Sequence, residues 1–329
     1  MSQSLPSVSV IIAARPDQAE IKSVEAARRL DYPADQLEIL VARGKQPSIQ
    51  RNAAIKAARG EWIYFLDDDS VPPSDNLQRA AKHFSDPVVK MIGGPNLCPP
   101  DAPPLEQVFA VVLASWIAFG PSRARYASVG TVRPSGEKEL ILCNLLARRE
   151  DLLALGGFNE ALYPNEENAL MDELQKRGGK LIYDPAFIVQ RRPRHSLAAF
   201  IRMLRTYGRG RAEQFRVTPT FGSVLNFVPP MFCVYLASLL VFHLAALGQP
   251  FGLRQAASLV PLVLYGIAVL LQTAASIPGY GFFRSVKALP LLVASHLFYG
   301  MGFWHGLFTK LRRQGQSAKF QVVLERVSP

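Results

Sequence analysis

Three consecutive aspartates, Asp67, Asp68 and Asp69, are the residues whose types and spacing most directly suggest chemistry. Three carboxylates in a row repel one another, and a bound cation relieves that repulsion. Hard divalent ions such as Mg²⁺ and Mn²⁺ prefer carboxylate oxygens and usually share their coordination shell with phosphates. In an extended chain, side-chain alternation turns Asp67 and Asp69 the same way and Asp68 the other way. The alternative is a solvated acidic turn ahead of Pro72 and Pro73.

Short apolar runs alternate with amphipathic stretches before this acidic trio, and they form the elements that must position it. The pattern predicts strands at 8–12, 37–41 and 62–66 and helices at 18–30 and 48–59, the second helix capped by Ser48 and ended by Gly60. This order predicts a parallel sheet with right-handed crossovers. Ligands of such sheets bind at the carboxyl ends of the strands, where the acidic trio follows the third strand.

The charge of the chain is divided unevenly between its two halves. Residues 1–190 hold 21 Lys and Arg against 24 Asp and Glu, whereas residues 191–329 hold 16 against 2. The second half is basic and apolar, which favours a membrane surface over a nucleic acid because no aromatic and basic RNA-binding motif occurs. The three cysteines are scattered without a CxxC pair, which argues against a disulfide framework or a structural zinc site.

Three stretches of the second half lack Asp, Glu, Lys and Arg over about the length that a helix needs to cross a bilayer. They are 228–247, 256–275 and 288–308. A buried soluble helix is the alternative for each stretch alone. We expect a multi-pass protein of the cytoplasmic (inner) membrane with its N-terminal half in the cytosol, because the sequence shows no signal peptide and eight arginines in 191–216 precede the first stretch. Three full crossings would put Lys310 and Arg312 on the far side, so either the last stretch is re-entrant or one stretch does not cross.

The segment between the two halves predicts an amphipathic helix in the headgroup plane. Its apolar positions Leu197, Phe200, Ile201 and Leu204 recur at helical spacing. The planar guanidinium group of arginine can bind a phosphate through two parallel hydrogen bonds. The residues predicted to contact the phosphate of a lipid acceptor are Arg191, Arg194, Arg202 and Arg209. The alternative is simple attraction to anionic lipid. The predicted regions are a domain at 1–190, this basic segment at 191–226, an apolar region at 227–309 and a basic tail at 310–329.

Several segments together resemble the family 2 glycosyltransferases, which have the GT-A fold. The matching segments are "VSVIIAAR", "QRNAAIKAARGEWIYFLDDDS", "GGFNEALYPNEENALMDELQKRGG" and "YDPAF". The resemblance covers 7–216 and implies a Rossmann-like α/β domain with a mixed, mainly parallel sheet. The interfacial helix and the transmembrane region predicted above follow this domain. The apolar stretches are similar to those of bacterial exopolysaccharide enzymes of the succinoglycan-biosynthesis type.

The resemblance implies roles for the residues that match the family's motifs. Its Asp-x-Asp motif falls on Asp67 and Asp69, which implies that they hold Mg²⁺ or Mn²⁺ with the ribose and diphosphate of a nucleotide sugar. Its Glu-Asp base motif falls on Glu166 and Glu167, which puts the base at Glu167 and leaves Glu166 as a rival. The other implied nucleotide-sugar-binding residues are Arg15, Arg51, Asn52, Asp68 and Asn144.

Three departures from the family pattern matter. Position 167 is Glu where the family has Asp, so its carboxylate reaches one methylene further. The loop after the second strand, "VARGKQPSIQRN", lacks the usual base-recognising Asp, which leaves the nucleotide undetermined. The Gln-x-x-Arg-Trp motif of the processive synthases is missing, which argues against a long-chain synthase.

The chemistry of sugar transfer requires two separate acidic groups, which agrees with an aspartate cluster at 67–69 and a glutamate pair at 166–167. The leaving diphosphate needs a cation, and the incoming hydroxyl needs a base. The alternative for the glutamate pair is an exposed helix start, where acids suit the helix dipole. We expect a metal-dependent glycosyltransferase that inverts the anomeric configuration and acts on a hydroxyl of a lipid-linked acceptor, for polysaccharide or glycoconjugate synthesis. The alternatives are a polyprenyl-phosphate glycosyltransferase, whose ionised acceptor hardly needs a base, and a non-catalytic nucleotide-binding membrane scaffold.

Overall fold

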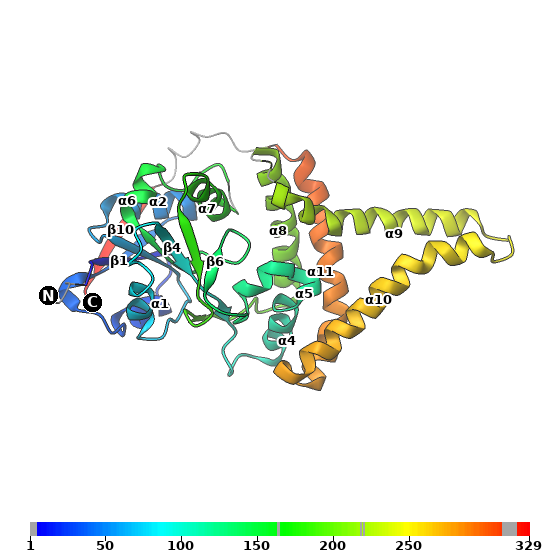
Figure 1. Ribbon diagram of the computed structural model, residues 1–329, viewed down its shortest axis with the longest axis horizontal. Helices are drawn as coiled ribbons and strands as arrows, with labels where there is room; N and C mark the ends of the chain where they lie inside the picture. The colour runs from blue at the N-terminus through cyan, green and yellow to red at the C-terminus, as the bar shows by residue number, and fades with distance from the viewer. Residues whose placement is uncertain (1–4, 163–164, 218, 220, 311–320) are drawn as a thin grey trace. The chain divides into compact units, whose positions relative to one another are not determined.

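The computed structural model describes residues 5–162, 165–217, 219, 221–310 and 321–329 of the chain (Figure 1). Its contacts divide the chain into two compact units. Unit 1 comprises Met1–Asp101, Pro121–Arg192 and Arg312–Pro329, and unit 2 comprises Ala102–Gly120 and Pro193–Leu311. The two units are described separately below.

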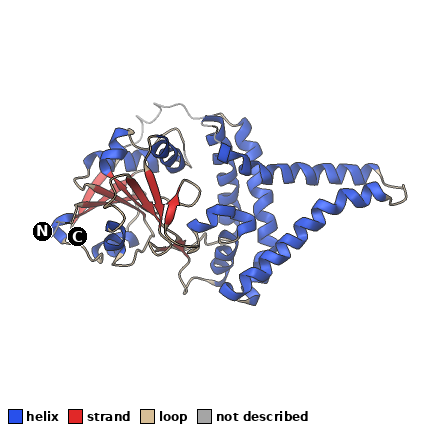
Figure 2. Ribbon diagram, viewed as in Figure 1, coloured by secondary structure: helices blue, strands red, loops and turns tan. Residues whose placement is uncertain are grey.

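Unit 1 is built on an eight-stranded sheet in the order β10-β2-β1-β3-β7-β4-β8-β6 (Figure 2). Its strands are β1 (Val8–Ala14), β2 (Leu37–Arg43), β3 (Trp62–Asp67), β4 (Val89–Gly93), β6 (Arg133–Ser135), β7 (Asn144–Arg148), β8 (Lys180–Tyr183) and β10 (Val323–Val327). The pairs β1–β2, β1–β3 and β4–β8 are parallel, and the other four pairs are antiparallel. The sheet is therefore mixed, with the predicted parallel strands near its centre.

The first three strands and the two helices between them confirm the predicted order. The connecting helices are α1 (Lys22–Arg28) and α2 (Pro47–Ala57). The prediction that Ser48 caps the second helix is wrong. The cap is Gln46, whose side chain accepts a hydrogen bond of 2.9 Å from the Ile49 amide, and Pro47 takes the first helical position, where no amide donor is needed. Ser48 lies inside the helix and is buried.

Helices cover both faces of the sheet of unit 1. Alternate residues of each strand point to opposite faces and pack into two separate hydrophobic cores under these helices. Val10 and Ile12 of β1 belong to one core with Leu77 of α3 (Asn76–Ala81). Ile11 belongs to the other with Ile55 of α2 and Leu170 of α7 (Glu166–Lys176). The remaining short helices of this unit are η1 (Ala34–Gln36), η2 (Gly120–Arg125), which begins at the last residue of unit 2, and α6 (Arg149–Ala154).

A small two-stranded parallel ladder lies outside the main sheet. It joins β5 (Asn96–Leu97) to β9 (Val189–Gln190), and Gln190 also forms a bridge with Val71 just beyond the acidic trio. The Arg191 amide continues this ladder by donating to the Leu97 carbonyl at 3.0 Å. The backbone at Arg191 is therefore held beside the end of β3.

The segment predicted as a basic tail at 310–329 contains the edge strand of the sheet. β10 pairs antiparallel with β2, from Val323 opposite Arg43 to Val327 opposite Ile39. Glu325 accepts from Arg43 at 2.8 Å, so the strand carries an acid toward a basic neighbour. The alternating apolar pattern of this strand is short, and the basic composition of the tail did not indicate a strand. Residues 311–320 lie outside the described part of the chain.

Unit 2 consists of helices. They are α4 (Pro104–Leu113), α5 (Trp116–Phe119), α8 (Leu197–Val217), η3 (Phe221–Phe227), α9 (Val228–Ala245), α10 (Leu253–Tyr280) and α11 (Phe282–Phe308). The predicted amphipathic helix is α8, whose buried side includes Phe200, Met203 and Leu204. Leu197, which was expected on that side, is 45% exposed because it occupies the first position of the helix.

The helices α8 and α11 pack at very close range through glycines. A Cβ atom at Gly302 would overlap the Arg205 carbonyl oxygen, and one at Gly306 would overlap the Arg209 carbonyl. On the other side, a Cβ at Gly208 would overlap the Tyr299 carbonyl. Small residues four positions apart let two helix backbones approach each other in this way, so these glycines fix α11 along α8.

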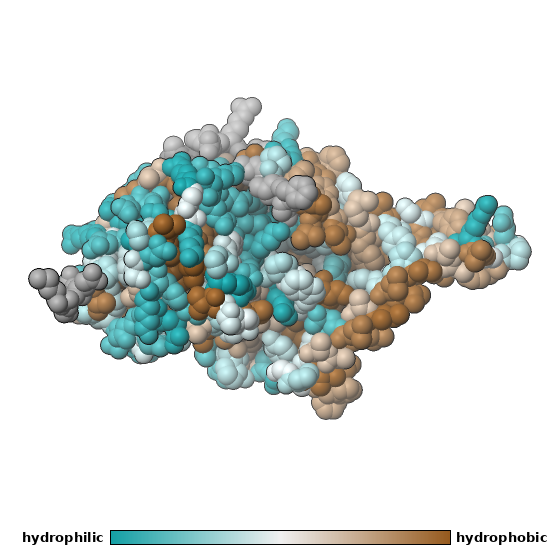
Figure 3. Space-filling model, viewed as in Figure 1, coloured by the Kyte–Doolittle hydropathy of each residue, from teal (hydrophilic) through white to brown (hydrophobic). Residues whose placement is uncertain are grey.

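Within the described residues, three helical stretches are long and apolar enough to cross a membrane: Val224–Ala245, Leu253–Tyr280 and Phe282–Phe308. A fourth exists if Pro104–Leu113 and Trp116–Arg125, which are bent by 62°, count as one broken span. Figure 3 shows apolar side chains along α10. The three stretches fall on the three predicted apolar runs.

Candidate active site

The acidic trio lies at the carboxyl end of β3, as the sequence predicts. Ala13 of β1 lies opposite Asp67, and Leu66 lies opposite Asn144 of β7. The chain then turns, with the Ser70 amide donating to the Asp67 carbonyl at 3.1 Å. The trio therefore follows a central strand with paired neighbours on both sides, which fixes its backbone.

Two arginines connect Asp67 and Asp69 of the trio with Glu166 in a chain of ion pairs. Arg51 of α2 donates from Nη2 to Asp67 Oδ1 at 3.1 Å and from Nη1 to Glu166 Oε1 at 3.1 Å. Arg191 donates from Nη2 to Asp67 Oδ2 at 3.2 Å, and its Nε donates to Asp69 Oδ1. The order Glu166–Arg51–Asp67–Arg191–Asp69 thus brings together residues from four separate parts of unit 1.

Asp68 lies outside this chain of ion pairs, as the sequence predicts, although it belongs to the turn after β3 and not to the strand. Its carboxylate accepts a hydrogen bond of 2.7 Å from Gln18 Nε2, and its carbonyl accepts from the Ser23 amide at 3.2 Å. These contacts tie the turn after β3 to the start of α1. Gln18 therefore supports the site, a role that the sequence pattern did not indicate.

The glutamate pair opens α7 and its two members have different surroundings. Glu166 is buried, with 2% of its surface exposed, and Glu167 is half-buried. Burial, reinforced by the neighbouring charge of Glu167, raises the pKa of Glu166 to about 8, although Arg51 acts in the opposite direction. The residue before the pair, Asn165, has a positive φ of 94°, so the chain enters α7 through a left-handed turn.

Asn52 holds the loop that leads toward α7. Its Nδ2 donates to the Phe158 carbonyl at 2.9 Å and to Glu160 Oε1 at 3.0 Å, and its Oδ1 accepts from the Phe158 amide at 2.8 Å. Gly157 has a φ of 81°, and a Cβ there would overlap Asn52 Oδ1. The paired glycines in the sequence were the available signal for this close approach.

Two other residues implied to bind a nucleotide sugar, Asn144 and Arg15, are not members of the chain of ion pairs. Asn144 is fully buried, and its amide is occupied by the Tyr64 hydroxyl at 2.9 Å and the Phe187 carbonyl at 2.6 Å. Arg15 is exposed at the end of β1, where its carbonyl accepts from Arg43 at 3.3 Å. The structure thus brings together Arg51, Asp67, Asp69 and Glu166, with Arg191 added, but not these two.

The chemistry of the carboxylates fits a divalent cation. Asp67 and Asp69 supply hard oxygen donors, and both already converge on one cationic group, the guanidinium of Arg191. Burial opposes the charged form of Arg191, but Asp67 and the other neighbouring groups hold its pKa well above the usual range. Among the described residues, no group of three or more His, Cys, Asp or Glu side chains surrounds one point. A cation bound by the two aspartates would therefore need further oxygens from a ligand.

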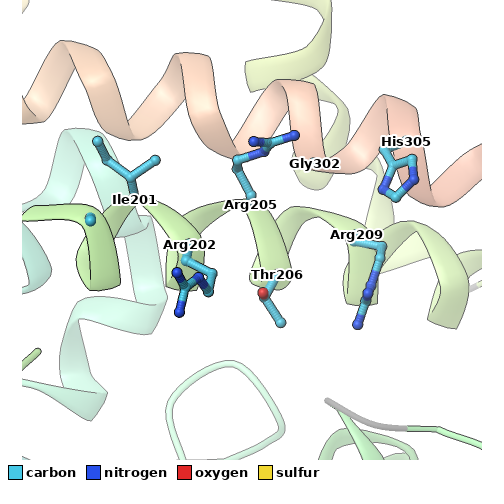
Figure 4. Close-up of a pocket in the computed structure, with 8 residues that line it drawn as sticks. Ile201, Arg202, Arg205, Thr206, Arg209, Gly302 and His305 are labelled. Carbon is cyan, nitrogen blue, oxygen red and sulfur yellow. The ribbon is translucent and has the colours of Figure 1, made fainter.

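A separate basic pocket of about 460 Å³ lies in unit 2 between α8 and α11 (Figure 4). Its lining residues are Ala198, Ile201, Arg202, Arg205, Thr206, Arg209, Gly302 and His305. Arg202, Thr206 and Arg209 project from one side of α8, whereas Arg205 points toward α11. Arg209 lies 3.4 Å from Glu213, the acid one turn further along α8. The pocket combines cationic and hydroxyl donors, which suits an anionic group.

The predicted phosphate contacts divide between the two units. Arg202 and Arg209 line the pocket of unit 2. Arg194 is exposed ahead of α8 and does not line it. Arg191 lies in unit 1 on the aspartates, because the β5–β9 ladder directs its side chain there.

The sheet order and the acidic strand end define unit 1 as a GT-A-like α/β domain. Residues 22–106 match the sequence model of the family described as "Glycosyl transferase family 2". The chain is 28% identical over 174 residues, half of its length, to the pre-mycofactocin glycosyltransferases of two Mycobacterium tuberculosis strains, CDC 1551 and H37Rv. The chain spans about a third of the length of these curated relatives, since the match covers 34% of them.

A solved structure has the same overall architecture. It is the mannosyltransferase PcManGT from Pyrobaculum calidifontis in complex with GDP-Man and Mn²⁺, with a TM-score of 0.52, 20% identity and 88% of each chain covered. At this identity the likeness establishes the fold. The family match includes α1, α2 and the acidic trio, and it ends before the glutamate pair.

Proposed function

We propose that this protein is a membrane-associated, metal-dependent, inverting glycosyltransferase. It transfers a sugar from a nucleotide-diphosphate sugar to a hydroxyl of a lipid-linked acceptor at the cytosolic face of the inner membrane, for polysaccharide or glycoconjugate synthesis. The observation that carries the proposal is the double ion pair of Arg51 with Asp67 and Glu166, which joins the acidic strand end to the glutamate pair within one unit.

The donor side of the reaction depends on the end of β3. A divalent cation, bound by Asp67 and Asp69, would stabilise the charge that develops on the leaving diphosphate. Arg191 lies against the same carboxylates and can pair with phosphate oxygens through its planar fork. Arg51 holds Asp67 from the other side, so the donor carboxylate is fixed before substrate arrives.

The acceptor side depends on the start of α7. Glu167 is half-buried and takes the proton of the incoming hydroxyl in this proposal, while Arg51 holds the buried Glu166 in place. Attack from the face opposite the leaving group inverts the anomeric carbon. The arginines and Thr206 of the basic pocket in unit 2 bind the phosphate of the lipid carrier.

Transfer of label from a panel of radiolabelled nucleotide sugars to extracted lipid carriers, in membranes containing the protein, tests the proposal. Asp69→Asn and Glu167→Gln are each expected to lower the rate, the second by about 10²–10⁴-fold, which is the usual contribution of a general base. Glu173→Gln is the matched control on α7, because its carboxylate forms an exposed ion pair with Arg177.

The outcomes separate the candidate functions. Transfer that survives both substitutions overturns the assigned roles. Loss in Glu166→Gln with full activity in Glu167→Gln moves the base to Glu166. A labelled lipid monophosphate identifies a polyprenyl-phosphate glycosyltransferase, and nucleotide-sugar binding without product across the donor panel identifies a non-catalytic scaffold.

A further inference from the structure

The ends of unit 2 limit how many times the chain can cross a membrane. Strands β1 to β9 of unit 1 precede the apolar helices and β10 follows them, yet β10 pairs with β2 in the same sheet. A folded sheet with polar loops lies on one side of a bilayer, because its backbone groups cannot remain unpaired in hydrocarbon. The number of full crossings between Arg192 and Val323 is therefore even.

The return of the chain to the sheet rests on more than one contact. Arg326 pairs with Glu38 at 2.9 Å and donates to the Ala57 carbonyl at 2.8 Å. Arg28 of α1 donates to the Ser328 carbonyl at 3.1 Å. Together with the Arg43–Glu325 pair, these contacts bind β10 to three different elements of unit 1.

The same argument applies to the excursion through α4 and α5. It leaves unit 1 after β5 and re-enters it before β6, which lies in the same sheet as β4. A single crossing at 102–120 is therefore excluded. At 1.5 Å per residue, the ten residues of α4 extend about 15 Å, half of a hydrocarbon core.

Of the three remaining candidates, α9 and α10 have the surfaces that suit lipid. Only Pro230 of α9 is buried, and only Val269, Thr273 and Ser276 of α10 are buried. By contrast, nine residues of α11 are buried. Apolar side chains more than half exposed on α9 and α10 are Val228, Met231, Leu240, Val241, Leu244, Leu253, Val260, Val263, Leu264, Leu270 and Leu271.

The position of α11 is tied to that of α8. Besides the glycine contacts at Gly302 and Gly306, Arg216 at the end of α8 donates to the Gly306 carbonyl at 3.1 Å and the Thr309 carbonyl at 2.6 Å. Because Arg202 on α8 is exposed and charged, α8 is excluded from the hydrocarbon core. The helix that runs alongside it stays at the same level.

The helical stretch Val224–Ala245, which contains α9 and the end of η3, and the helix α10 are each long enough to cross, and they are joined at one end. They extend away from α8 and α11 and meet at the 246–252 turn (Figure 1). Between the two helices, Tyr235 donates to the Ser258 carbonyl at 2.8 Å and His243 lies 3.1 Å from the Ser258 hydroxyl. At 1.5 Å per residue, Val224–Ala245 extends about 33 Å and α10 about 42 Å, against a core of about 30 Å.

We infer that α9 and α10 form a two-span hairpin in the bilayer, and that α11 lies with α8 at the headgroup level on the side of unit 1. The charges of the sequence agree with this topology. The 246–252 turn has no Lys or Arg and only Arg254 lies beside it, whereas Arg284, Lys287 and Lys310 fall on the side of unit 1. The topology is independent of whether the protein transfers sugar.

Cysteine labelling with a membrane-impermeant maleimide in sealed vesicles tests the inference. The background carries Cys98→Ala, Cys143→Ala and Cys233→Ala, and each reporter is introduced singly. The reporters are Gln249→Cys in the α9–α10 turn, Gly279→Cys at the end of α10, Lys310→Cys after α11 and Ser85→Cys in unit 1 as the reference. We expect the last three to react from the same side, and Gln249→Cys to react from the opposite side only.

Every other pattern overturns the inference in a distinguishable way. Reaction of Lys310→Cys on the side of Gln249→Cys means that α11 crosses. Reaction of Gly279→Cys opposite to the reference means that only one of the two helices crosses: α10 if Gln249→Cys reacts on the reference side, and α9 if Gln249→Cys reacts on the opposite side. Reaction of both Gln249→Cys and Gly279→Cys on the reference side means that α9 and α10 both remain on that side. Gly279 has open space around its Cβ position, so this reporter is tolerated by the fold.

Discussion

Replacing Arg51 by methionine removes the central cation of the site while keeping most of the side-chain volume. Only 9% of the Arg51 side chain is exposed, and its two carboxylate partners are Glu166, with 3% of its side chain exposed, and Asp67, with 25%. Asp67 keeps its second partner, Arg191, in the variant. The substitution therefore leaves Glu166 as the buried charge without its cation.

The expected loss follows from that single uncompensated carboxylate. Removing one partner of a buried ion pair typically destabilises a protein by about 3–5 kcal/mol, because the other charge stays buried. Protonation of Glu166 offsets part of this loss, and the offset grows at low pH. Arg51→Met should therefore lower the free energy of unfolding of unit 1 by about 3–5 kcal/mol above pH 8, where Glu166 is ionised in the folded protein, and by less at pH 5. Combining it with Glu166→Gln should recover most of the loss.

Urea unfolding in detergent, followed by the fluorescence of Trp62, measures this quantity. Trp62 is buried in unit 1 and stacks on Phe84 at 4.6 Å, and replacing the other two tryptophans by phenylalanine makes it the sole reporter. Arg177→Met is the matched control, because its pair with Glu173 is about half exposed and should contribute at most about 1 kcal/mol. An Arg51→Met loss no larger than that of the control, or a double variant no more stable than Arg51→Met alone, refutes the reasoning.

Three further outcomes are expected. The pKa of Glu166 in the folded protein, about 8, lies above its ordinary value of 4.5, so the folded state binds more protons than the unfolded state. The stability of unit 1 should therefore fall as the pH rises between these two values. Urea titrations at several pH values should show that Glu166→Gln flattens this dependence. Gly157→Ala should cost more than about 1 kcal/mol in the same urea assay, since alanine resists a φ of 81° and its methyl group overlaps Asn52, and an unchanged midpoint contradicts this account. Arg202→Gln should weaken the binding of a short-chain polyprenyl diphosphate in detergent by at least about tenfold, because a hydrogen bond to a charged group contributes about 1.5–3 kcal/mol. Arg211→Gln, which lies outside the pocket, should leave this binding unchanged.

Local periodicity predicted the central elements of unit 1 well. The β1–α1–β2–α2–β3 order depends on contacts between neighbours in sequence, and the acidic trio could be placed at a strand end from that order alone. The antiparallel strands β7 and β10 were not predicted as sheet neighbours. Their partners are remote in the chain, as with Glu325 of β10 and Arg43 of β2, and no local pattern encodes such pairing.

The site shows the same division between local and remote information. The predicted separation of Asp68 from Asp67 and Asp69 is found, but a turn produces it, because Asp68 and Asp69 come after the last residue of β3. Arg191 was grouped with the lipid-facing arginines because it opens a basic run, yet a two-residue ladder with Asn96 and Leu97 brings it to the aspartates instead. Charge composition states how many cations a segment holds, but only the backbone path decides which carboxylate each one meets.

The edge of the sheet at β2 has a consequence for biosynthesis. Its partner β10 lies after α11 in the chain, so the ribosome produces the closing strand only after both hairpin helices have been made. Until then β2 presents an open ladder on which another polypeptide could add a strand. Completion of the domain is thereby delayed until membrane insertion is under way, and a nascent chain released early would lack the strand that protects its own edge.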